Sequence, residues 1–313
     1  MSAVPATIER TTPRTKEKGR GARIVMYVAL IVFAVAFLVP VYVAIITALK
    51  TTQEVATGGT WDLPISPTFD NFTTAFDTLS SGLGNSVLLT LPGVIISALL
   101  GSMNGYVLSK WKFRGSDLLF TVMLFGMFIP YQSVLIPLGQ FLQAINLYAT
   151  IPGLILVHVV YGIPITTLIF RNYYAGVPKE LIESGTVDGA GFFGIYRNIV
   201  FPISMPGFVV VLIWQFTAIW NEFLFAVVLS GNTVRPVTVA MFNFVSVEQT
   251  LWAKLAAGAM LAMAPVILPL QTPLQPQISA SSESAATAAL GSPSAPPDAK
   301  AWPKISASRM SSS

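Results

Sequence analysis

Residues 24–49 read IVMYVALIVFAVAFLVPVYVAIITAL, an apolar run of 26 residues without a charge. A helix rises 1.5 Å per residue, so about 20 apolar residues cross the roughly 30 Å hydrocarbon core of a bilayer. The run exceeds the roughly 7 to 15 residues of a signal-peptide core, and no small-residue cleavage site ends it. Residues 24–49 therefore predict an uncleaved first membrane span.

Further apolar runs recur along the chain, and the composition agrees with them. They occupy residues 86–108, 118–138, 150–170, 206–229 and 253–270. Hydrophobic residues make up 53% of the 313 residues and charged residues 10%, whereas about 25% of an ordinary soluble domain is charged. A soluble globular protein is excluded. The sequence predicts an all-α polytopic membrane protein with six transmembrane helices, which residues 24–270 form.

The basic residues indicate how the predicted spans are oriented. Six spans leave both termini on one side of the membrane. Fifteen of the 18 Lys and Arg residues fall on that side, including those of the basic tail at residues 1–23, and only Lys50, Arg235 and Lys254 fall on the other. Because basic loops face the cytoplasm, both termini are expected there. The net charge of +4 follows from this topology, and no nucleic-acid partner is implied.

Motifs for catalysis and for metal binding are missing from the sequence. No G-x-x-x-x-G-K-[ST], H-E-x-x-H or G-x-S-x-G is found, and the chain has no cysteine. The one histidine, His158, lies in the fourth predicted span, where we interpret it as a packed helix-interface residue hydrogen-bonded to a neighbour. A role in a transport path is the alternative. The sequence indicates no enzyme, no ATP site and no metal site in this chain.

The most informative loop lies between the fourth and fifth predicted spans, at residues 177–206. Glu180 and Glu183 suit the positive end of a helix dipole, and Asp188-Gly189 predicts a turn after that helix. A second amphipathic helix is expected next and should stop before Pro202, because the residue before a proline is pushed out of the α region. Its apolar positions are Phe192, Ile195, Tyr196 and Ile199.

Small residues mark the tip of this loop. They are Ser184, Gly185, Gly189 and Ala190. Small side chains leave the backbone open to close approach, so this tip is suited to being bound by another protein. A surface helical hairpin that merely joins two spans is the alternative.

The loop resembles the EAA motif of ABC-importer permeases. The matching residues are Glu183, Asp188, Gly189, Ala190, Pro202 and Pro206. The chain departs from the motif at Ser184-Gly185, where the family has two alanines; the side chains stay small, although helix propensity falls. Docking should survive this change.

Other segments, up to about residue 270, are similar to carbohydrate-importer permeases of the maltose-permease type. They are Asn104-Gly105-Tyr106 with Lys110-Trp111, Phe128-Ile129-Pro130-Tyr131-Gln132, Arg171-Asn172-Tyr173-Tyr174 and Trp220-Asn221-Glu222-Phe223-Leu224. The sequence around Pro130 and Tyr174 most resembles that of permeases for glucose and similar monosaccharides.

This resemblance implies a permease subunit in a bacterial or archaeal plasma membrane. The implied partners are a second homologous permease, a pair of ATPase subunits that carry ATP and Mg, and an extracytoplasmic solute-binding protein. The chain itself would bind no cofactor. The resemblance assigns coupling to the ATPase to Glu180, Glu183, Ser184, Gly185, Asp188, Gly189 and Ala190.

Sugars are held by aromatic faces and by amide or carboxyl groups, so such residues within spans are candidates for a sugar path. They are Asn104, Tyr131, Gln132, Trp220, Asn221 and Glu222. Interfacial anchoring is the alternative for the tryptophans, and a permease interface for Asn221 and Glu222. Prolines at 130, 137, 152 and 164 fit either a lined cavity or helix bends that tighten packing.

The composition changes abruptly after the sixth predicted span. Ser, Ala and Pro supply 26 of the 43 residues in 271–313, so this tail is expected to be disordered. An altered reading frame is the alternative to a genuine tail. Two rival functions remain from the sequence: an ABC permease for a non-sugar solute, and an ion-coupled secondary transporter.

Overall fold

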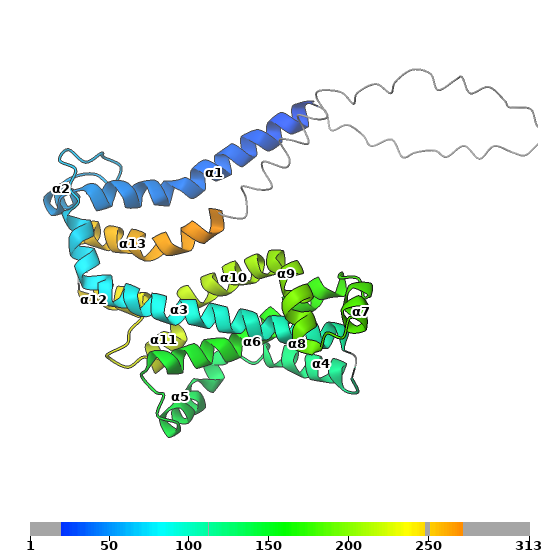
Figure 1. The fold of residues 1–313 in the computed structure, drawn as a ribbon. Helices are drawn as coiled ribbons and strands as arrows, with labels where there is room; N and C mark the ends of the chain where they lie inside the picture. The colour runs from blue at the N-terminus through cyan, green and yellow to red at the C-terminus, as the bar shows by residue number, and fades with distance from the viewer. Residues whose placement is uncertain (1–19, 112, 248–250, 272–313) are drawn as a thin grey trace, which may run out of the picture. The chain divides into compact units, whose positions relative to one another are not determined.

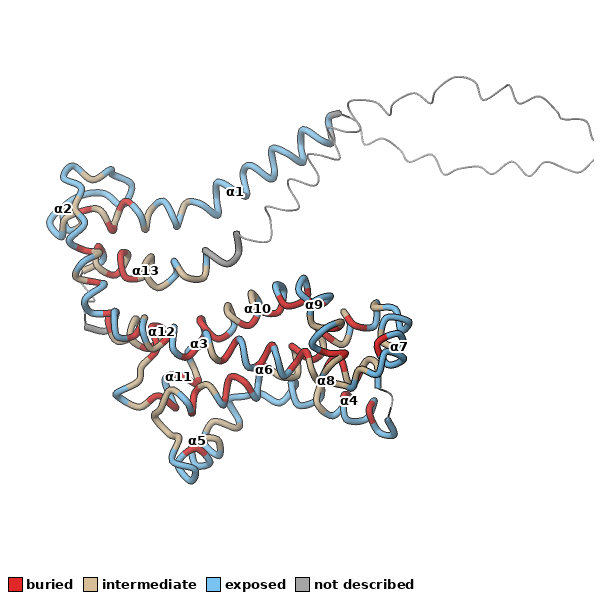
Figure 2. Tube along the Cα trace, in the orientation of Figure 1, coloured by how far each residue is buried: buried red, intermediate tan, exposed pale blue. Residues whose placement is uncertain are grey.

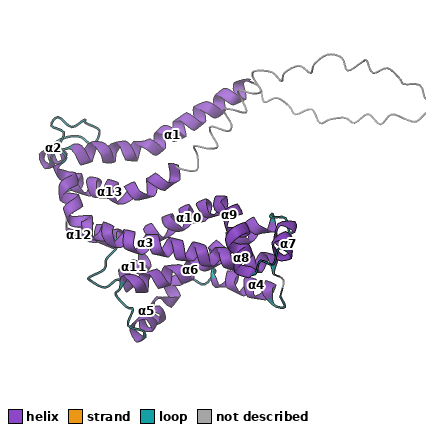
Figure 3. Cartoon of the chain, viewed as in Figure 1, coloured by secondary structure: helices purple, strands orange, loops and turns teal. Residues whose placement is uncertain are grey.

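The structure is a computed structural model that describes residues 20–111, 113–247 and 251–271. Those residues form helices joined by loops (Figure 1; Figure 3). In chain order the elements are α1 (Arg20–Leu49), α2 (Thr52–Thr57), α3 (Asp70–Lys110), α4 (Ser116–Gly126), the 3₁₀ helix η1 (Tyr131–Val134), α5 (Leu135–Ala144), α6 (Ile151–Ala175), α7 (Glu180–Val187), α8 (Phe192–Ile195), the π-helical η2 (Tyr196–Val200), α9 (Phe201–Ile203), α10 (Met205–Trp220), α11 (Leu224–Leu229), α12 (Val237–Val247) and α13 (Trp252–Gln271). The predicted tail at 271–313 lies almost wholly outside the described residues.

Several of these helices have the length and composition of membrane spans. Among the described residues, α1, α3 and α6 are long and apolar enough to cross a bilayer. Two bent pairs, α4 with η1–α5 and α8–α9 with α10, raise the number to five if each pair is one span, and α13 is a shorter apolar helix. The all-α membrane class is confirmed. Six spans stay a prediction.

The third predicted span is not one helix. Helix α4, which ends at Gly126, and the helical segment Tyr131–Ala144 meet at an angle of 88° across a short break. Pro130 stands at this break as the residue before η1. A proline lacks the backbone N–H and disfavours the α conformation of the preceding residue, so Pro130 favours a break in the helix here. By contrast, Pro164 lies inside α6, which continues past it.

A seam of small residues holds α3 against α6. Gly93, Ser97, Gly101 and Gly105 recur at every fourth position of α3 and are buried there. A Cβ added at Gly105 would lie 2.7 Å from Phe170 Cβ, and one at Gly101 would overlap Thr166. Thr166 Oγ1 donates to the Ser97 carbonyl at 3.1 Å. Small side chains thus let the two backbones approach closely, as membrane helix pairs commonly do.

A second buried cluster joins α1, α3, α12 and α13. Its members are Ala48, Ala75, Leu79, Phe244, Leu255 and Ala257. The buried Asn71 amide donates to the carbonyls of Ala48 (2.9 Å) and Lys50 (2.8 Å), which satisfies the last carbonyls near the end of α1. Most of α1 before this cluster is exposed (Figure 2). An apolar helix face of this extent is suited to lipid or to another membrane subunit.

The loop after α1 is ordered by one carboxylate. Glu54 accepts hydrogen bonds from the backbone N–H groups of Thr51 (2.9 Å), Ile65 (3.0 Å) and Ser66 (2.9 Å). Hydrogen bonds to the charged form, that of Thr51 foremost, hold the pKa of Glu54 below its ordinary value.

The chain divides into two compact units, Met1–Val266 and Ile267–Ser313. Of the second unit the structure describes only the end of α13.

Candidate functional site

Helix α7 occupies the first half of the loop that the sequence singles out. It spans Glu180–Val187, with both Glu180 and Glu183 in its first turn, where their charges oppose the positive end of the helix dipole. Asp188 follows as the C-terminal capping residue. The predicted helix with acidic residues at its start is confirmed.

Gly189 makes the turn that ends this helix. Its φ is +80°, in the left-handed region that other residues adopt only at a cost. The N–H of Gly189 donates to the Thr186 carbonyl at 3.0 Å, and that of Ala190 donates to the Gly185 carbonyl at 2.9 Å. The chain therefore reverses here because position 189 is glycine, as the sequence predicts.

The seven predicted coupling residues do not all face outward. Glu180, Glu183, Ser184, Asp188 and Gly189 are exposed. Gly185 is buried and lies close to Ile199, since a Cβ added at Gly185 would be 2.7 Å from Ile199 Cδ1. Ala190 is half-buried and packs against the core of the loop. The prediction that all four small residues of the tip lie open is wrong for Gly185: its small size seats α7 on the following helix.

One exposed apolar residue of α7 was missed by the sequence reasoning. Val187 is 87% exposed, and Leu181 is 41% exposed on the same helix. Exposed apolar side chains beside charged ones are a common composition of binding surfaces. The sequence signal was the valine directly before Asp188, at the end of a helix in which Ile182 packs against the core.

The second half of the loop carries the contacts to the membrane helices. Tyr196 Oη donates to Ser102 Oγ of α3 at 2.9 Å, and Ser102 Oγ and Tyr174 Oη of α6 lie 2.6 Å apart in a second hydrogen bond. The Tyr106 ring packs on Phe192, with centroids 5.2 Å apart. The buried core around these residues also includes Ala98, Phe170, Ile195, Val200, Phe208 and Val211. The second half of the loop is thereby packed against both α3 and α6.

The helix after Gly189 runs further than expected. Tyr196–Val200 is a π turn in which the N–H of Phe201 donates to the Tyr196 carbonyl, and α9 continues through Pro202 to Ile203. The expected stop before Pro202 is wrong, because the wider π turn shifts the carbonyls that the proline ring would otherwise meet. The chain bends instead at Ser204, by 77°, before α10 begins.

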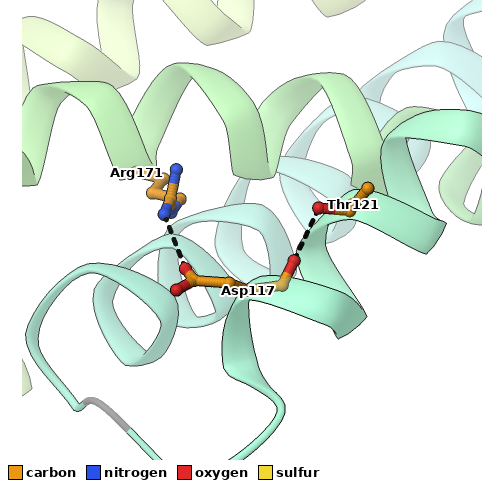
Figure 4. A network of polar contacts seen from close by, with 3 residues as sticks. All are labelled: Asp117, Thr121 and Arg171. Carbon is orange, nitrogen blue, oxygen red and sulfur yellow. Dashed lines mark hydrogen bonds and ion pairs between the residues drawn. The ribbon is translucent and has the colours of Figure 1, made fainter.

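An ion pair fixes α4 to α6 near the same loop. Arg171 Nη2 lies 3.3 Å from Asp117 Oδ1, and Thr121 Oγ1 donates to the Asp117 carbonyl at 2.7 Å (Figure 4). The Arg171 guanidinium also lies 4.1 Å from the centre of the Phe120 ring. Lys110, at the end of α3, donates to the Val177 carbonyl at 2.5 Å. Basic residues thus cluster at the end of the helix bundle that bears the loop.

Three aromatic rings surround Phe225 elsewhere in the fold. The ring of Tyr131 lies 5.2 Å from that of Phe225, Tyr161 lies 4.9 Å from it, and His158 meets it edge-on at 5.8 Å. Tyr131 and Tyr161 are each 38% exposed, and Gln132 beside Tyr131 is also exposed. Tyr161 was not among the sequence candidates; an aromatic residue one turn from His158 in the same span was the available signal.

His158 is buried, as the sequence predicts, but the expected hydrogen bond to a neighbour is not found among the described residues. The side chain is 5% exposed, and Nε2 has no hydrogen-bond partner among the described residues. Its contacts are apolar and aromatic. The interpretation as a packed helix-interface residue therefore holds, while the hydrogen bond at Nε2 is absent.

Glu222 and Trp220 have structural partners within the chain. The Glu222 carboxylate accepts hydrogen bonds from the N–H groups of Phe225 (2.8 Å) and Ala226 (3.1 Å), the first turn of α11. Trp220 is 3% exposed and donates from Nε1 to the Ala262 carbonyl of α13 at 2.9 Å. A carboxylate at a helix start and a buried indole bonded to a neighbouring helix are both stabilising arrangements.

The other path candidates are dispersed. Asn221 is exposed and donates to the Thr217 carbonyl at 2.9 Å, whereas Asn104 is half-buried beside Gly105 of the α3–α6 seam. The structure therefore brings Tyr131 and Gln132 near α11, and leaves Asn104 at the loop end of α3. The described residues hold no group of three or more His, Cys, Asp or Glu side chains able to bind a metal ion.

Apolar helices packed through small residues, with an exposed helical loop held on them by buried hydrogen bonds, define an all-α multi-pass membrane protein. The chain belongs to the family of binding-protein-dependent transport system inner membrane components, whose pattern matches residues 93–275. As such a permease component it is a transport subunit and not an enzyme.

Relatives of known name agree with this assignment. The chain is 38% identical over 246 residues to the xylose/arabinose import permease protein of Haloferax volcanii, covering 70% of this chain and 78% of that protein. It is 31% identical over 244 residues to the glucose import system permease protein of Saccharolobus solfataricus, covering 75% and 85%. In fold it is similar, with a TM-score of 0.73 and 20% identity, to a chain in the crystal structure of a bacterial ABC transporter involved in alginate import, covering 83% of this chain and 99% of that one.

Proposed function

We propose that this chain is one of two permease subunits of an ATP-driven importer for a monosaccharide or a similar sugar, and that it forms half of the translocation path. Relatives named for xylose, arabinose and glucose import support the sugar. The family description supports delivery of that sugar by a solute-binding protein. ATP and Mg would be bound by a separate pair of ATPase subunits.

The observation that carries the proposal is the seating of α7. Its outer face is exposed at Glu183, Asp188 and Val187, while its inner face meets Ile199 through Gly185. Tyr196 then joins the next helix to α3 through Ser102. An ATPase subunit that binds the outer face would move a loop that is rigidly connected to two membrane helices. Closure of the ATPase pair could thereby rock the spans between two open states.

The sugar path is proposed to pass the aromatic group around Phe225. Tyr131 and Tyr161 are partly exposed there, and neither hydroxyl has a hydrogen-bond partner among the described residues. A free hydroxyl or a broken helix within a span is tolerated where it meets protein or water and not lipid. The aromatic group around Phe225 is therefore better suited to lining a water-filled path than to facing lipid. Gln132 and Asn221 are exposed and would offer amide groups to the sugar. Asn104 would contact the sugar at another point of the path, on α3.

Membrane location and partners complete the proposal. The chain would lie in a bacterial or archaeal plasma membrane with both termini in the cytoplasm, since Lys110, Arg171 and Lys179 gather at the end that bears α7. The exposed apolar face of α1 is suited to the second permease.

Affinity purification of the tagged chain from its native membrane tests the proposal. Co-purification of an ATPase, a second permease and a solute-binding protein is expected, together with sugar uptake that vanadate blocks. Purification without an ATPase, or uptake that a protonophore abolishes while ATP is maintained, would refute it in favour of an ion-coupled transporter.

A further inference from the structure

A cavity of about 680 Å³ lies where α1 meets the α2 loop and the start of α13. Its walls are contributed by Pro40, Val43, Ala44, Thr47, Lys50, Val55, Gly58, Gly59, Thr60, Trp252, Leu255 and Ala256. The part formed by α1 and α13 is almost wholly apolar, and the part formed by the loop carries backbone and hydroxyl groups. The cavity is therefore amphipathic along its length.

Lys50 is the charged group of this cavity. It is the first residue after α1, so it stands where a membrane span ends and the interface with water begins. The residue is 4% exposed, and its ammonium donates to the Gly59 carbonyl at 2.9 Å. An ammonium has three N–H donors, so one carbonyl leaves it incompletely satisfied.

No carboxylate of the described residues forms an ion pair with Lys50. The two nearest acids in sequence are engaged by backbone instead: Glu54 accepts from three N–H groups, and Asp62 Oδ2 accepts from the Gly59 N–H at 2.6 Å. A buried cation without an anion is costly, and an anionic ligand would relieve that cost.

We propose that this cavity binds an anionic phospholipid, with the headgroup phosphate on the Lys50 ammonium and an acyl chain between α1 and α13. The charge, the apolar walls and the position at the end of a span all suit this occupant. A wholly apolar helix of a neighbouring subunit would fill the walls but leave Lys50 without an anion. A zwitterionic lipid would bring a competing cation to the same place.

Lipid retention by the purified full importer tests this assignment. The complex is stripped of lipid, incubated with phosphatidylglycerol or phosphatidylcholine, and the lipid bound to this chain is counted by native mass spectrometry. One phosphatidylglycerol per chain is expected, with little phosphatidylcholine and no displacement by inorganic phosphate. Lys50→Met should weaken phosphatidylglycerol binding by about tenfold or more, because hydrogen bonds to charged groups are among the stronger ones.

A second variant separates lipid binding from the structural bond between Lys50 and Gly59. Ala44→Phe fills the cavity from α1 and leaves that bond in place, so it should also lose the lipid. Ala34→Phe, the same change at an exposed position of α1 outside the cavity, should retain it. Equal retention by Lys50→Met and the unaltered chain, equal binding of both lipids, or equal behaviour of the two phenylalanine variants would each overturn the proposal. None of these readouts depends on sugar transport.

Discussion

Tyr196 donates a hydrogen bond to Ser102 Oγ at 2.9 Å, and this bond joins η2, in the second half of the loop at 177–206, to membrane helix α3. Ser102 is fully buried, and the Tyr174 hydroxyl lies 2.6 Å from the same oxygen. Three hydroxyls from α3, α6 and η2 thus meet at one point. In the proposed mechanism this contact would carry a displacement of α7 to two membrane helices.

Tyr196→Phe should weaken this connection without unfolding the chain. One buried hydrogen bond contributes about 1 kcal/mol, so uptake per ATP hydrolysed is expected to fall by about fivefold. The measurement is sugar uptake and ATP hydrolysis by the importer in proteoliposomes. Tyr148→Phe is the matched control, since its hydroxyl bonds to the Val228 carbonyl away from the loop. Equal losses in both variants would argue against a coupling role.

Gly189→Asp should uncouple ATP hydrolysis from uptake while the chain stays in the membrane. The change strains a backbone at φ +80° and adds a charge beside Asp188 on the exposed tip. Gly191→Asp adds the same charge where φ is −74°, and should retain more uptake. Membrane content by immunoblot, ATPase activity and uptake are compared. Normal uptake in Gly189→Asp would contradict the assignment of this loop.

Gly101→Ala should destabilise the α3–α6 pair. The new Cβ would overlap Thr166, and overpacking of this kind costs about 1–3 kcal/mol. Gly84→Ala lies on the same helix with no atom within 4 Å of the added Cβ, so it should be neutral or slightly stabilising. Thermal unfolding of the detergent-solubilised variants gives the comparison. Equal unfolding temperatures for Gly101→Ala and Gly84→Ala would contradict a stabilising role of the α3–α6 seam.

Glu222→Ala should lower stability more than it alters the apparent sugar affinity. Loss of the two hydrogen bonds to Phe225 and Ala226 is expected to cost about 1 kcal/mol, as for other helix caps. Glu222→Gln keeps an acceptor oxygen and should recover part of the loss. Unfolding temperature and the KM for uptake are measured together. A raised KM with an unchanged unfolding temperature would instead place Glu222 in contact with the sugar.

The sequence predicted those features that local chemistry determines. The 26-residue run at 24–49, the acidic first turn of α7 and the glycine turn at 189 all follow from residue type and spacing. Features that depend on tertiary contacts were not predicted. The inward face of Gly185 requires Ile199, the cap made by Glu222 requires α11 to begin at Leu224, and the π turn before Pro202 requires the core beneath it.

The α3–α6 seam shows that a signal can be present and still be overlooked. Gly93, Ser97, Gly101 and Gly105 repeat at intervals of four in the sequence, which is a known pattern of close membrane helix pairs. The repeat does not specify its partner helix. Only the contacts of Gly101 with Thr166 and of Gly105 with Phe170 identify α6.

Site-specific cross-linking from α7 tests the central claim most directly, namely that this exposed helix binds an ATPase subunit. The chain has no cysteine, so Val187→Cys introduces a single thiol for a thiol-reactive photo-cross-linker. Ile65→Cys is the matched control, because Ile65 is 89% exposed, as Val187 is 87% exposed, on the distant loop between α2 and α3. The account predicts an adduct between Val187→Cys and an ATPase subunit and none from Ile65→Cys. Absence of an ATPase adduct at Val187, in a complex that hydrolyses ATP and imports sugar, would contradict it.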